Sequence, residues 1–166
     1  MGVVQAEPSA AKKELIAKVL LARIENSHIH FMAREGVDLS GLHEANLLQA
    51  SDFVRSAQMA QRIGFDWLEL HYAHGYLMSA FITPLTNKRT DGYGGSLENR
   101  AWPLLEAVRR CRAATGPAFG IGVKLNSSDF QKGGLSTADS VQVAQWLEGL
   151  GVDLLEVSGG NYEAPE

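Results

Sequence analysis

The sequence predicts an α/β protein in which parallel strands alternate with helices. Three short apolar segments, at residues 66–71, 119–125 and 153–158, have the length and composition of buried strands. A longer segment whose apolar residues recur with helical spacing precedes each of them. This alternation is typical of a parallel sheet. In such sheets, substrates bind at the loops that leave the carboxyl ends of the strands.

The helix boundaries are predicted from capping residues. Ser51-Asp52 can cap a first helix that runs to Ile63 and stops at Gly64. Its apolar face holds Phe53, Ala57, Ala60 and Ile63.

The second and third helices are also capped at their first residues. Ser96 caps a helix from Leu97 to about Ala114, in which Pro103 is expected to remove a hydrogen bond or kink the first turns. The residues expected to be buried on it are Leu104, Leu105, Val108 and Cys111. Ser136, with Asp139 three residues later, predicts a capping box for a helix to Leu150. The glycines Gly120 and Gly122 in the middle strand suggest close backbone packing or ligand approach.

Two imidazoles and a phenol directly follow the first strand. His71 and His74, three apart across a tight turn, can point N–H donors at one oxygen atom, and Tyr76 can supply a proton from the other side of a bound molecule. One such residue at a strand end is usually a structural residue whose polar atoms are satisfied within the fold. Three together favour a functional site.

The loop from Thr83 to Ser96 is expected to be mostly scaffold. Its proline and three glycines are typical of turns, and the polar side chains of Asn87, Arg89 and Asp91 can bond one another and the backbone. An Arg89–Asp91 ion pair that fixes the loop is the first interpretation, and contact with a substrate or a second subunit is the alternative. The glycines do not form a nucleotide-binding motif.

Four runs of sequence resemble a known family. Residues 71–77 read HYAHGYL and residues 81–100 read FITPLTNKRTDGYGGSLENR, and matching runs follow at 123–134 and 151–160. Over about residues 52–162 the chain resembles the old yellow enzyme family of FMN-dependent NAD(P)H oxidoreductases.

The resemblance implies a TIM (β/α)8 barrel that binds FMN, uses NAD(P)H as reductant and reduces the activated C=C bond of an enone-like molecule. His71 and His74 match the pair that hydrogen-bonds the substrate oxygen, and Tyr76 matches the proton donor. Lys124 matches a position where many relatives carry an arginine beside N1 and the C2 carbonyl of the flavin, although lysine offers a point charge rather than a fork. The alternative for Lys124 is a solvated lysine at a strand end.

The length of the chain leaves two functions open. A complete barrel needs on the order of 250 residues, and this chain has 166. An incomplete barrel is therefore expected, without the first strands and without the last two β/α units, which the resemblance implies hold the flavin phosphate. One function is the FMN-dependent oxidoreductase. The alternative is a truncated, non-catalytic relative that binds a partner or forms a homo-oligomer through its open sheet edges.

The sequence divides into two parts, a segment of unclear assignment at 1–50 and a partial (β/α) barrel at 51–166. The first part is expected to contain an amphipathic helix from about Ser9 to Glu25 and a short strand around His28 and His30. A metal site is not predicted, because further ligands are not arranged near the two histidines.

Composition narrows the class of partner. With a net charge of −4 and no basic cluster, the chain is not expected to bind nucleic acid. No apolar run approaches the length of a membrane span and no signal sequence opens the chain, so residence in the cytoplasm is expected. The small-molecule partner is expected from the family resemblance. The single cysteine, Cys111, is expected in the core.

Overall fold

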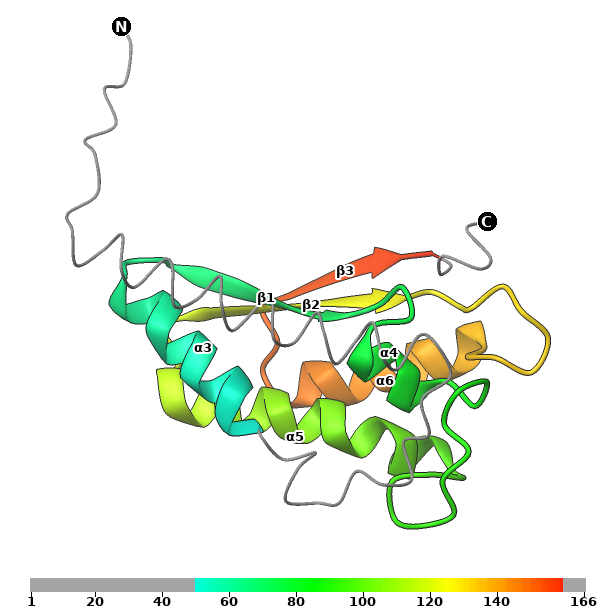
Figure 1. Cartoon of the computed structure of the whole chain (residues 1–166). Coiled ribbons are helices and arrows are strands. Elements are labelled where there is room, and N and C mark those ends of the chain that lie inside the picture. The colour runs from blue at the N-terminus through cyan, green and yellow to red at the C-terminus, as the bar shows by residue number, and fades with distance from the viewer. Residues whose placement is uncertain (1–49, 160–166) are drawn as a thin grey trace, which may run out of the picture.

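A computed structural model of the chain describes residues 50–159, which form a three-stranded parallel sheet and four helices (Figure 1). The strands are β1 (Trp67–Tyr72), β2 (Gly120–Asn126) and β3 (Leu154–Ser158), in the order β1-β2-β3. The helices are α3 (Ala50–Arg62), α4 (Leu77–Ile82), α5 (Leu97–Thr115) and α6 (Thr137–Gly149). The predicted alternation of helices and parallel strands is confirmed.

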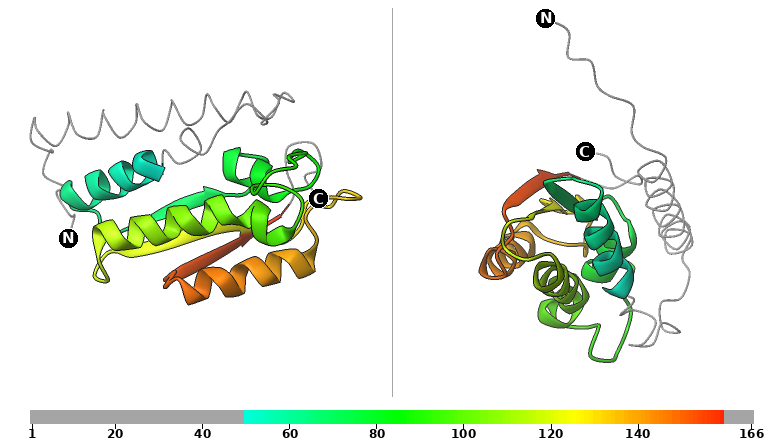
Figure 2. Two further views of the ribbon diagram at one scale, coloured as in Figure 1. Left: turned by 90° about the horizontal axis from the view of Figure 1, so that it is seen from below. Right: turned by 90° about the vertical axis from the view of Figure 1, so that its left-hand side faces the viewer.

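The two faces of the sheet have different surroundings. Helices α3, α5 and α6 lie against one face, as the two turned views show (Figure 2). That face carries the buried side chains Leu70, Tyr72, Ile121, Val123 and Leu125. On the other face, here called the helix-free face, Trp67 and Leu154 are 49% and 47% exposed. Among the described residues, therefore, only one face of the sheet packs against helices.

The helix-free face is defined by alternate residues of the three strands. Its side chains come from Trp67, Glu69 and His71 of β1, from Lys124 and Asn126 of β2, and from Leu154, Glu156 and Ser158 of β3. Because successive side chains of a strand point to opposite faces, the neighbours of these residues form the core with the helices.

Two of the three predicted caps are confirmed. The third prediction is wrong, because α3 begins at Ala50 and Ser51 and Asp52 therefore lie inside its first turn instead of before it. The hydroxyl oxygen of Ser96 accepts a hydrogen bond from the Asn99 amide, which satisfies one free amide at the start of α5. Ser136 and Asp139 form the predicted capping box of α6. Helix α5 continues through the buried Pro103 to Thr115, and Cys111 lies in the core as expected.

The short helix α4 was not predicted from the sequence. Its six residues read LMSAFI, too few for a helical period to be recognised, and no side chain caps its first turn. Burial stabilises it instead, because Met78, Ala80, Phe81 and Ile82 all belong to the core. The helix matters for the site because Tyr76 is its N-cap residue.

Three predictions lie outside the described residues: the amphipathic helix from Ser9 to Glu25, the strand at His28 and His30, and the assignment of residues 1–50 as a separate segment. Within residues 50–159, no helix is both long enough and apolar enough to cross a membrane.

The glycines of β2 make room for a tryptophan. A Cβ atom at Gly120 would lie 2.6 Å from Cβ of Trp67, and one at Gly122 would lie 3.0 Å from the edge of the same indole ring. Close packing, rather than ligand approach, therefore accounts for these two glycines in the structure.

Replacing Gly120 with alanine is expected to lower the free energy of unfolding by about 1–3 kcal/mol, because the added methyl group overlaps Trp67. Urea unfolding followed by circular dichroism measures the change. Gly149→Ala, at the end of α6, is the matched control, since a Cβ there meets no atom within 4 Å. Equal stability of the two variants would contradict the packing role of Gly120.

Candidate active site

Strand register brings the predicted site residues to one end of the sheet. His71 of β1 pairs with Lys124 of β2, which pairs with Glu156 of β3. One step further along, Asn126 of β2 pairs with Ser158 of β3. Because the strands are parallel, all these residues lie near the carboxyl ends of their strands, where α4 and the following loops also lie (Figure 1).

A tight turn after β1 returns the chain toward the sheet. His74 and Gly75 have φ angles of 61° and 78°, a left-handed conformation that is uncommon for histidine. The backbone amide of His74 donates to Oδ1 of Asn126 at 3.2 Å, and the amide of Gly75 donates to Oγ of Ser79 at 3.2 Å. These bonds to β2 and α4 hold the turn in a conformation that local preference disfavours.

The turn gathers three aromatic side chains. The ring centroids of His71 and Tyr76 lie 4.4 Å apart, those of His71 and His74 lie 5.1 Å apart, and those of His74 and Tyr76 lie 6.3 Å apart. All three pairs are edge-to-face. The predicted histidine pair and tyrosine are therefore brought together, within reach of one small molecule.

His74 is held on its ring side as well. Its Nε2 lies 2.5 Å from Oγ of Ser158, which joins the turn after β1 to the end of β3. Burial lowers the pKa of His74 from its ordinary value, and the charge of Lys124 lowers it further, while Glu156 opposes the shift. At neutral pH His74 is thus an uncharged imidazole, with one donor and one acceptor nitrogen.

Lys124 is ion-paired rather than solvated. Its Nζ lies 2.6 Å from Oε1 of Glu156, and its side chain is 23% exposed. The hydrogen bond and the charge of Glu156 raise the pKa of Lys124, with a smaller contribution from Glu69. The lysine therefore carries a fixed positive charge on the same face as His71 and His74.

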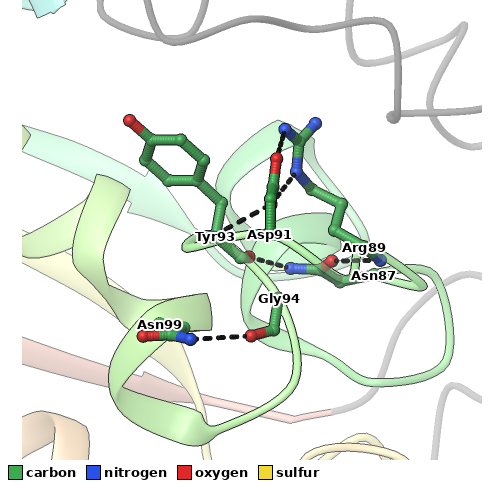
Figure 3. Close-up of polar contacts among 6 residues, drawn as sticks. All are labelled: Asn87, Arg89, Asp91, Tyr93, Gly94 and Asn99. Atoms are coloured by element: carbon green, nitrogen blue, oxygen red, sulfur yellow. Dashed lines mark hydrogen bonds and ion pairs between the residues drawn. The ribbon is translucent and has the colours of Figure 1, made fainter.

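The loop between α4 and α5 is a self-bonded scaffold. Nε of Arg89 donates to Oδ1 of Asp91 at 2.9 Å, and Nδ2 of Asn87 donates to the carbonyl oxygen of Tyr93 at 2.7 Å (Figure 3). Nδ2 of Asn99 in α5 donates to the carbonyl oxygen of Gly94 at 3.0 Å. The predicted ion pair is confirmed, and the loop is tied to the start of α5.

Comparison with known proteins identifies the family. The sequence model of the NADH:flavin oxidoreductase / NADH oxidase family matches residues 26–164. This chain belongs to that family. The match begins at residue 26, earlier than the motifs from residue 52 onward indicate. The family, whose solved relatives include old yellow enzymes, uses FMN as cofactor and NAD(P)H as reductant.

This chain matches only part of the length of its sequence relatives. An NADPH dehydrogenase of Bacillus pumilus is 46% identical over 109 residues, which are 65% of this chain and 31% of that enzyme. An NADH oxidase of Thermoanaerobacter brockii is 43% identical over 112 residues, 68% of this chain and 17% of the oxidase. The chain thus spans about a third or less of the length of these relatives.

Solved structures confirm the fold. A 2-naphthoyl-CoA reductase in complex with 2-naphthoyl-CoA superposes with a TM-score of 0.72 at 32% identity, covering 75% of this chain and 19% of the reductase. An old yellow enzyme homologue from Zymomonas mobilis superposes with a TM-score of 0.62 at 29% identity, covering 70% and 34%. The described α/β units are accordingly part of a TIM barrel.

The sequence predicted the candidate donor residues but not the residues that contact them. Asn126 and Ser158 bond His74, and Glu156 and Glu69 surround Lys124, yet none of them was assigned a role. Their spacing in the sequence could have indicated them. Asn126 follows Lys124 by two positions and Ser158 follows Glu156 by two, and residues two apart in a strand point to the same face of the sheet. Pairing between strands then decides which of these residues meet.

We expect the pKa of His74 in the folded chain to lie below the ordinary histidine value near 6.5. The unfolded chain binds the proton more readily, so stability rises with pH through this window and is lost as the pH falls below about 6.5. NMR titration of the ring signals measures the pKa directly. Lys124→Met should raise it, because a positive charge is removed, whereas Lys132→Met on an exposed loop should leave it unchanged. A His74 that titrates alike in all three proteins would contradict this electrostatic coupling.

Proposed function

We propose that this chain provides the substrate-binding and proton-donating centre of an FMN-dependent oxidoreductase that uses NAD(P)H to reduce an activated C=C bond in an enone-like small molecule. The observation that carries the proposal is the cluster of His71, His74 and Tyr76, whose ring centroids lie within 6.3 Å of one another. Residence in the cytoplasm is part of the same proposal.

The two histidines have the chemistry to bind a carbonyl or nitro oxygen. Negative charge grows on that oxygen when the conjugated C=C bond is reduced, and N–H donors fixed beforehand stabilise it. His74 is fixed by Asn126 through its backbone and by Ser158 through its ring. His71 lies within β1 itself, so its backbone is fixed by the sheet.

Tyr76 is suited to deliver the proton. A phenol is uncharged at pH 7 and still acidic enough to act as a general acid. Its ring packs edge-on against His71, and its carbonyl oxygen accepts the Ala80 amide at 2.7 Å at the start of α4. The proposed donor is therefore held beside the histidines by the first turn of a buried helix.

The residues on the helix-free face fit a flavin ring. An isoalloxazine edge presents carbonyl and nitrogen acceptors, and Lys124 places a cationic donor in the row next to His71. Bound FMN would supply the redox chemistry, passing reducing equivalents from NAD(P)H to the alkene. Among residues 50–159 we assign no group to the phosphate of FMN.

A groove favours a second candidate, a partial barrel that binds a second copy of the chain. The groove has a volume of about 510 Å³ and lies between α6 and β3. Val141 and Val157 line it and are 52% and 64% exposed. Burial of these side chains against another molecule would favour association.

Titration with FMN, followed by quenching of flavin fluorescence and by the mass of the species formed, tests the first candidate. We expect saturable binding that Lys124→Met weakens by about ten-fold to a hundred-fold, because a hydrogen bond to a charged group contributes about 1.5–3 kcal/mol. Lys132→Met is the matched control. Absence of binding up to millimolar FMN would reject the oxidoreductase, and a dimer without flavin would support the second candidate.

Tyr76→Phe tests the proton donor in a preparation that reduces an enone. Its kcat should fall on the order of 100-fold, because the phenyl ring keeps the packing but carries no proton. Oxidation of NADPH by the bound flavin should continue, since that half-reaction needs no proton from Tyr76. Tyr93→Phe, in the scaffold loop, should retain wild-type rates in both. Unchanged enone turnover in Tyr76→Phe would show that another group donates the proton.

A further inference from the structure

The ring of His74 is engaged by a hydroxyl group on its Nε2 side. Nε2 lies 2.5 Å from Oγ of Ser158, the last residue of β3. This contact leaves Nδ1, among residues 50–159, as the ring nitrogen open to a ligand. The contact itself fits two arrangements, because a hydroxyl group can donate or accept and a neutral imidazole has one donor and one acceptor nitrogen.

The backbone of Ser158 is fixed by the sheet. Ser158 pairs with Asn126 in the register of β2 and β3, and its carbonyl oxygen accepts the Ser127 amide at 2.6 Å. The side chain of Asn126 in turn accepts the backbone amide of His74 at 3.2 Å. Two residues that face each other across adjacent strands thus hold the histidine, one by its backbone and the other by its ring.

The two arrangements differ in what His74 can offer to a substrate. The lowered pKa of His74 leaves the ring uncharged at neutral pH, so only one of its nitrogens carries a hydrogen atom. If Nε2 carried it, the hydrogen bond would run from the ring to Ser158, and Nδ1 would be a bare acceptor that repels a carbonyl oxygen. If Ser158 donates instead, the hydrogen lies on Nδ1 and the ring presents a donor.

We propose that the Ser158 hydroxyl donates its hydrogen to Nε2 of His74 and so places the ring hydrogen on Nδ1, the nitrogen that donates to the substrate oxygen. The proposal rests on the function proposed above, because only this arrangement makes the neutral His74 an N–H donor toward a ligand. Ser158 acts through His74 and is therefore a positioning residue, not a catalytic one.

The serine also strengthens the donor that it positions. A hydrogen bond accepted at Nε2 draws electron density from the ring and polarises the Nδ1–H bond, because hydrogen bonds in a chain polarise one another. Negative charge that grows on the substrate oxygen increases this polarisation along the chain from Ser158 through His74. The donor is thus in place before the charge develops, and the imidazole stays neutral throughout.

Heteronuclear NMR of the histidine rings in the ligand-free, full-length chain tests the proposal directly. Above neutral pH, where His74 is uncharged, the nitrogen shifts distinguish the nitrogen that carries hydrogen from the bare one. We expect His74 to carry hydrogen on Nδ1, and Ser158→Ala to shift the population toward Nε2–H. Ser158→Thr, which keeps the hydroxyl group, and Ser56→Ala, on α3, should match the wild type. A wild-type His74 with hydrogen on Nε2, or an unchanged population in Ser158→Ala, would overturn the proposal.

A second readout uses a preparation that reduces an enone. Ser158→Ala should lower kcat about ten-fold, less than the roughly 100-fold loss typical of removing a donor to the developing charge, because His74 itself is kept. Oxidation of NADPH by the bound flavin should be unaffected, and Ser158→Thr should keep enone turnover. Equal kcat in Ser158→Ala and the wild type would contradict the proposal. A wild type that reduces no enone would reject the proposed function alone, because the ligand-free chain decides the position of the ring hydrogen independently.

Discussion

The in-register pairing of three parallel strands is the constraint on which the candidate site depends. It places His71, Lys124 and Glu156 in one row and Asn126 and Ser158 in the next. A slip of one residue in any strand would turn its polar side chains into the helix-packed face. The apolar residues between them prevent such a slip, because the same slip would bring their side chains out of the core. Core packing and site geometry are therefore two results of one register.

Polar groups near the site are held by partners from distant parts of the chain. His74 contacts β2 through its backbone and β3 through its ring. The buried carboxylate of Asp129 accepts hydrogen bonds from the Thr83 hydroxyl and from the Leu135 amide, which ties the loop after β2 to the end of α4. The turn after β1 and the loop after β2 are thus held by contacts with other elements. The proposed stabilisation of a developing charge requires such a fixed arrangement.

Charge on the helix-free face is balanced rather than uniform. Lys124 alone would attract a negatively charged ligand strongly, but the ion pair with Glu156 balances its charge. The positive charge also disfavours protonation of His74. His74, Lys124 and Glu156 therefore form one electrostatic unit, in which the charge of each group shifts the pKa of its neighbours.

The sequence by itself predicted most of the elements, the family and the candidate donor residues. Apolar periodicity and capping residues such as Ser96 and Ser136 are local signals, and the motif from His71 to Tyr76 is contiguous. Only the tertiary structure decided which residues support those donors. Helix α4 forms because the core buries it, and the contacts of His74 with Ser158 and of Lys124 with Glu156 join residues 84 and 32 positions apart. Such contacts follow from strand pairing, which no single segment of sequence encodes.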